Sequence, residues 1–191
     1  MAEGSFRRTI LVLQGLLITL VVGYVLDLQR SVLKLNLYTE QFLLAVLGLA
    51  IALCFLMTCR HRIVDAAAAL AGLGICLYLA VRYPQLSTEL TSRPLDGILT
   101  SAALALLVLE GTRRMAGFSL VGFTLAGVLY ALWGHNLPGV FQARPVEFTR
   151  LLVYLGLDTN ALLGTSLQIG IIVVIPFILM GQVLSRCGGA E

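Results

Sequence analysis

The sequence predicts an all-α integral membrane protein, a polytopic bundle of about six transmembrane helices. Composition is the first reason, because 59% of the 191 residues are apolar and only 12% are charged, whereas roughly one quarter of a soluble domain is charged. Such a chain cannot cover itself with polar surface. The second reason is that long stretches contain no ionisable residue, and a helix of about 20 residues crosses a hydrocarbon core of about 30 Å.

Six stretches of the chain carry no charge, and we expect a transmembrane helix in each. The first follows Arg7 and Arg8. It predicts a retained span rather than a cleaved signal peptide, because its apolar core is too long and no cleavage site follows. The fourth is the weakest, since it reaches spanning length only if Asp96 and Glu110 lie at its ends, at the level of the lipid headgroups. The stretches are residues 9–26, 41–59, 66–81, 97–109, 115–134 and 159–185.

The segments between these stretches hold the helix-breaking residues, as expected where irregular backbone must stay out of lipid. We expect loops at residues 82–96 and 135–150, and an amphipathic outer segment within residues 135–158. With a cytoplasmic N-terminus the inner side carries an excess of bases, as the positive-inside rule requires. The arginine pairs on that side are Arg7 with Arg8 and Arg113 with Arg114.

Proline interrupts the last charge-free stretch. Pro176 lies near its middle, and proline removes a backbone donor and kinks a helix. An ordinary kink is the commoner explanation of such a residue. The alternative is a broken helix of the kind with which transporters build ion and substrate sites at mid-membrane depth.

Residues for chemistry are missing from the predicted spans. No charged residue falls at a predicted bilayer centre, which argues against a proton relay, and His61 and His135 map to opposite faces, where they cannot share a metal or haem. We find no nucleophile with a base and no glycine-rich nucleotide loop. We therefore expect no enzyme, no metal and no cofactor. The cysteines have no CxxC spacing and are expected to be reduced: Cys54, Cys59, Cys76 and Cys187.

Four passages carry a resemblance to a known family. They are Leu109–Arg114, then Tyr130–Gly134 with Leu137–Gly139, then Arg150–Gly164, and finally Phe177–Gly189, which contains Gly181, Leu184, Arg186, Gly188 and Gly189. From about Leu95 onward the chain resembles the fused permeases of the tripartite ATP-independent periplasmic (TRAP) transporters, of the type that works with a TAXI-family binding protein. Residues 1–94 match that family only in layout, as small-permease-like helices.

The resemblance implies a membrane permease component of a secondary transporter in the inner membrane of a bacterium. A periplasmic TAXI-type binding protein would deliver an organic solute, commonly a carboxylate, and a sodium or proton gradient would drive import. It also implies that the chain is truncated, because the family's permease continues beyond the Gly-Gly pair into hairpins that form the substrate and cation sites. No substrate or cation residue is carried over. The implied partners are the binding protein, the remainder of the permease and the lipid bilayer, with no nucleic acid.

The predicted division is into residues 1–94, with about three small-permease-like spans, and residues 95–191, with about three spans that begin the fused permease region. This portion would serve as scaffold and docking surface. Arg144, Glu147 and Arg150 are the candidates for docking the binding protein; alternatively they belong to a solvated amphipathic helix. The alternative function is a small polytopic membrane adaptor or assembly protein without transport activity.

Overall fold

The computed structural model is helical and contains no strand in the residues that it describes, which are 2–28, 38–58, 62–88, 95–136, 142, 144, 146–158 and 160–189. In chain order the elements are α1 (Ala2–Val25), α3 (Thr39–Met57), α4 (Arg62–Thr88), α5 (Leu95–Ala116), α6 (Phe118–Trp133), the 3-10 turn η1 (Gly134–Asn136), α7 (Phe148–Leu157), α8 (Thr165–Ile169), the π-helical segment η3 (Gly170–Val174) and α9 (Ile175–Arg186). The prediction of an all-α protein is confirmed.

Five stretches are long and apolar enough to cross a membrane. They coincide with five of the six predicted spans, and they are Arg7–Val25, Thr39–Met57, Ile63–Pro84, Phe118–Asn136 and Thr165–Arg186. The fourth predicted span forms helix α5, but α5 is not among the five. Its first turn holds Asp96 and its last turn holds Arg113 and Arg114, so the apolar part is short, as the sequence suggested.

Helices α3 and α4 form the most closely packed part of the protein. Most of α3 is buried, and the fully buried side chains Leu44, Phe55 and Leu79 lie in this core. A Cβ atom at Gly48 would lie 2.8 Å from the Cβ atom of Cys76. In the absence of that atom the two backbones approach closely, which is the usual basis of helix association in lipid.

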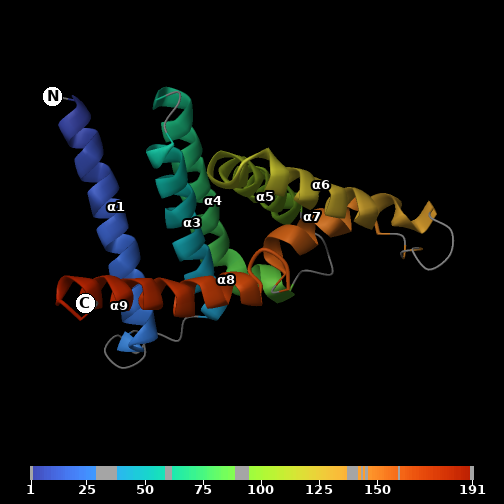
Figure 1. Ribbon diagram of the computed structural model, residues 1–191. Helices are drawn as coiled ribbons and strands as arrows, with labels where there is room; N and C mark the ends of the chain where they lie inside the picture. Colours follow the sequence, from blue (N-terminus) through green and yellow to red (C-terminus); the bar gives the residue numbers. More distant parts are fainter. Residues whose placement is uncertain are drawn as a thin grey trace.

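The remaining helices do not all stand parallel to this pair. In Figure 1, α1, α3 and α4 stand side by side, whereas α6 and α9 are drawn across that direction. Helix α9 passes the lower end of α1 and contacts it. The chain turns from α5 into α6 at Gly117, whose φ of 86° is accessible to glycine and unfavourable for other residues. This one-residue connection sets the change of direction between the two helices.

The predicted loop at residues 82–96 is wrong in its first half, because α4 continues to Thr88 and contains Pro84. Proline has no N–H to donate to the carbonyl of the residue four positions earlier, here Ala80. The side-chain amide of Gln41 in α3 donates to that carbonyl instead, at 2.8 Å. The neighbouring helix thus supplies the missing donor, and α4 passes through the proline.

The last predicted span also contains an irregularity at its proline. Pro176 is in the first turn of α9, and η3 directly precedes it, with the N–H of Ile175 bonded to the carbonyl of Gly170. Such π-helical turns lengthen the hydrogen-bond ladder by one residue and are common where a helix bends. The structure therefore locates a backbone irregularity at the predicted place, while the kink at Pro176 stays a prediction.

Candidate functional site: an ion cluster that joins three helices

Four charged side chains meet where α4 begins and α5 ends. Arg114 donates from Nη1 to Asp65 Oδ1 at 2.7 Å and from Nε to Glu110 Oε1 at 2.9 Å. Arg113 donates to the same Glu110 oxygen at 2.6 Å. Asp65 is in the first turn of α4, and both arginines are in the last turn of α5. Asp65 and the two arginines therefore have the sign that their helix ends favour, whereas Glu110 is an acid toward the C-terminus of α5. We call these four residues the ion cluster.

The third helix contributes aromatic and sulfur contacts to the same place. The Arg114 guanidinium lies over the ring of Phe55 in α3, 4.6 Å from the ring centre, a distance at which the cation is attracted to the ring face. The thiol of Cys54 points to the carbonyl of Gly111 at 3.7 Å. A single arginine thus contacts α3, α4 and its own helix α5.

Burial makes the pair between Asp65 and Arg114 different from the others. The Asp65 side chain is 1% exposed and that of Arg114 is 18% exposed, whereas Arg113 and Glu110 are 45% and 32% exposed. Removing one partner of a buried ion pair costs far more than removing one partner of an exposed pair. The hydrogen bonds from Arg113 and Arg114 lower the pKa of the Glu110 carboxyl below its ordinary value.

A small cavity lies beside the ion cluster. It has a volume of about 300 Å³ and is lined by Thr58, Arg113, Arg114 and Phe118. The Arg113 guanidinium is 5.5 Å from the centre of the Phe118 ring. Glu110 already accepts hydrogen bonds from both arginines, so the cavity wall carries little uncompensated positive charge. These contacts suit the joining of helices rather than the binding of a free anion.

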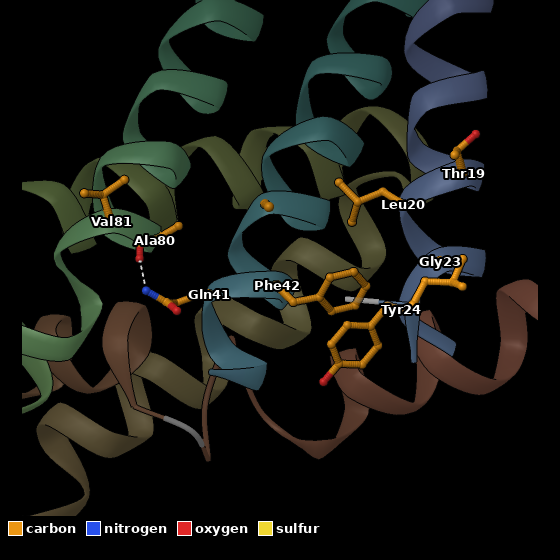
Figure 2. A pocket seen from close by; sticks show the side chains of 10 residues that line it. Thr19, Leu20, Gly23, Tyr24, Gln41, Phe42, Ala80 and Val81 are labelled. Carbon is orange, nitrogen blue, oxygen red and sulfur yellow. Dashed lines mark hydrogen bonds between the residues drawn. The ribbon is translucent and has the colours of Figure 1, made fainter. Parts of the chain in front are cut away.

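A second cavity lies at the other end of α3, between α1, α3 and α4. Figure 2 shows Tyr24 stacked on Phe42 beside the hydrogen bond from Gln41 to Ala80. The two rings are 3.7 Å apart, and the cavity of about 420 Å³ is lined mainly by apolar side chains. Its main polar group is the side-chain amide of Gln41. This amide donates to the carbonyl of Ala80 and accepts from the N–H of Tyr38.

The three predicted docking residues lie together along the chain before and within the first turn of α7. Arg144, Glu147 and Arg150 are all exposed, and Glu147 is the residue that precedes the helix. The segment is helical over Phe148–Leu157, and Val153 and Gly156 are buried. The expected amphipathic segment is therefore a helix with one buried side. Docking at the three exposed residues stays a prediction.

The buried side of α7 crosses α5 very closely. A Cβ atom at Gly156 would lie 2.5 Å from the Cβ atom of Ser101 and 2.7 Å from its Cα atom. The Ser101 hydroxyl is buried and has no hydrogen-bond partner in the described part of the chain. This crossing holds α7 against α5, the helix that carries three residues of the ion cluster.

Sequence reasoning placed the charges of the ion cluster on one side of the membrane but missed their pairing. The spacing of Glu110 from Arg113 and Arg114 is a signal for pairing, since residues three and four apart are neighbours on a helix. Asp65 and Arg114 are far apart in sequence, and only the packing of α4 against α5 brings them together. His61 and Cys59 lie outside the described residues, and His135 is exposed.

Among the described residues no three His, Cys, Asp or Glu side chains lie close enough to hold a metal ion. Comparison with protein families, with curated proteins and with solved structures finds no match for this chain.

Proposed function

We propose that this chain is the scaffold portion of a TRAP-type permease, in which residues 1–94 brace the permease region that begins at residue 95. The observation that carries the proposal is the ion pair between Asp65 and Arg114. It joins the two proposed portions. Its arginine, Arg114, is the last residue of Leu109–Arg114, one of the four passages on which the resemblance depends. A residue pair that fastens one portion to the other is what a brace requires.

The bilayer placement is part of the same proposal. Support comes from five helices that are long and apolar enough to cross a membrane. Many large apolar side chains on the peripheral helices are exposed, among them Phe123 in α6 and Phe177 in α9. Such surface suits contact with lipid or with further helices of a permease. We propose six crossings of a bacterial inner membrane, with α5 as the fourth and with the N-terminus in the cytoplasm.

Transport would use elements beyond this scaffold. We propose that the remainder of the permease holds the substrate and the coupling sodium ion or proton, and that a TAXI-type binding protein delivers an organic solute to the outer face. The exposed residues Arg144, Glu147 and Arg150 at the start of α7 are the proposed contacts for that binding protein. Their support is their exposure on a segment that is packed firmly against α5.

Reporter fusions test the crossings. A reporter active only in the cytoplasm is fused after residues 28, 58, 88, 116, 136 and 186, and a reporter active only in the periplasm is fused at the same places. Six crossings predict that the cytoplasmic reporter works after 58, 116 and 186 and the periplasmic one after 28, 88 and 136. The crosswise position of α6 and α9 makes the fusion after residue 136 decisive, because in-plane helices would leave it in the cytoplasm with residue 116, whereas six crossings place it in the periplasm.

Uptake and crosslinking test the function. A photoreactive residue at position 144 or 150 should capture a periplasmic solute-binding protein, whereas one at position 123 on α6 should not. In cells, deletion of the gene should abolish gradient-dependent uptake of at least one labelled carboxylate from a panel, and the gene should restore it. Unchanged uptake of every carboxylate, together with no captured binding protein, would favour a membrane adaptor without transport.

A further inference from the structure

Two cavities in series separate α1 from the pair formed by α3 and α4. Their volumes are about 560 and 510 Å³, and they share Leu70 and Leu73, so together they form one groove. The first is lined by Arg8, Thr9, Val12, Leu13, Ala52, Leu56, Ala66, Ala69, Leu70 and Leu73, and the second by Leu20, Ala45, Gly48, Leu49, Leu70, Leu73, Gly74, Cys76 and Leu77. The groove is apolar except at the end that holds Arg8.

The part of the groove that these two cavities form covers about one leaflet of a bilayer. Along α1 it extends from Thr9 to Leu20, which is about 16 Å at a rise of about 1.5 Å per residue, and half of a hydrocarbon core of about 30 Å is about 15 Å. Beyond Leu20 the groove continues into the cavity beside Tyr24 and Phe42, which shares Leu20 and Ala45 with it. If Arg8 lies at the level of the headgroups, Leu20 is near the middle of the bilayer.

The groove is closed on its α3 side and open between α1 and α4. Helix α1 contacts α3 through the side chain of Gln14, which lies 3.8 Å from the sulfur of Met57, and through the stacking of Tyr24 on Phe42, whereas the lining residues Val12 and Leu70 are 67% and 70% exposed. A helix with its side chains is about 10 Å across and could reach the floor of the groove only if the contacts between α1 and α3 broke. An acyl chain is much thinner and can lie between helices that remain in contact.

The charge at the mouth of the groove selects the headgroup. Arg8 is exposed and forms no ion pair with any residue that the structure describes. Arginine near a helix end extends its guanidinium to the membrane surface while its stem stays in the apolar region. Guanidinium groups bind phosphate through paired hydrogen bonds, so Arg8 can hold the phosphate of a lipid whose chain enters the groove.

We propose that the groove binds one anionic phospholipid of the inner leaflet, with its phosphate at Arg8 and one acyl chain between α1 and the α3–α4 pair. The lipid fills space between α1 and α4. Gly74 of α4 lines the groove, and an added Cβ atom there would have nothing within 4 Å. The inference rests on the bilayer placement proposed above and is independent of transport.

Lipid retention tests this site. The full chain is purified in detergent from membranes that contain phosphatidylglycerol, washed extensively, and examined by native mass spectrometry. The wild type should retain one phosphatidylglycerol molecule. Arg8→Gln should lower retention about fivefold, the effect expected from about 1 kcal/mol per arginine at a membrane surface. Arg7→Gln is the matched control, because Arg7 does not line the groove, and it should retain the lipid.

A second pair of variants tests the acyl-chain part. Gly74→Leu fills the groove and should abolish retention of phosphatidylglycerol. Gly122→Leu places the same side chain at an equally open position on α6 and should leave retention unchanged. Equal losses in both glycine variants, or in both arginine variants, would overturn the site. Extraction of the protein from membranes at alkaline pH would instead overturn the bilayer placement, so the two failures are distinguishable.

Discussion

At the scale of single residues, the ion cluster depends most on Arg114, because it connects the buried Asp65 of α4 to α5. Arg114→Gln removes this partner from a carboxylate that is 1% exposed, and we expect the free energy of unfolding to fall by about 3 kcal/mol. Arg113→Gln breaks an exposed pair and should cost less than about 1 kcal/mol. Denaturant titration in detergent micelles measures both, and equal losses would contradict the special role of the buried pair.

A second residue-scale prediction concerns the crossing of α5 and α7. Gly156→Ala adds a Cβ atom that would lie 2.7 Å from the Cα atom of Ser101, so backbone must move. We expect a loss of about 1–3 kcal/mol, as for other overpacked sites. Ser101→Gly in the same chain should recover part of the loss, since it removes the Cβ and Oγ atoms nearest to the clash. Full stability of Gly156→Ala alone would show that the crossing is looser than described.

At the scale of helices, the continuation of α4 through Pro84 depends on α3. Gln41→Leu leaves the Ala80 carbonyl without this donor and should cost about 1 kcal/mol. In a Pro84→Ala background the restored N–H can bond to that carbonyl, so Gln41→Leu should cost less there. Gln41 also accepts a hydrogen bond from the N–H of Tyr38, but that loss is the same in both backgrounds and cancels. A cost that does not depend on residue 84 would contradict the compensation.

The positions of the helices could be predicted from the sequence better than their ends and their contacts. Charge-free stretches located every spanning candidate because burial in lipid excludes charge from the middle of a helix. The end of α4 was missed because a proline followed by four hydroxyl residues usually marks a loop. The hydrogen bond that Pro84 cannot make to Ala80 is replaced by Gln41, which is 39 positions before Ala80, and no local pattern contains that contact. The ion pair of Asp65 with Arg114 could not be predicted for the same reason. The pair of Glu110 with Arg114 could have been predicted, because the two residues are four positions apart on one helix.

At the scale of the whole molecule, the sequence indicated that helices fill the chain but not how they are inclined to one another. The close packing of α3 and α4 depends on Gly48 and Gly72, at which a Cβ atom would clash with the facing helix, and the structure was needed to single them out. The turn of direction at Gly117 could not be predicted either, because a glycine between two apolar stretches does not reveal its φ angle. The crosswise placement of α6 in Figure 1 follows from this connection.

The two arginines of the ion cluster have different effects during membrane insertion and after folding. During insertion the translocation machinery reads the bases of a nascent chain and largely ignores neighbouring acids, so in the proposed topology Arg113 and Arg114 would help to retain their end of α5 in the cytoplasm. After folding, their charge is matched by Glu110 and Asp65. The four residues of the ion cluster are therefore neutral as a group, and in the proposed topology attraction to acidic lipid is left to bases outside the cluster, such as Arg8.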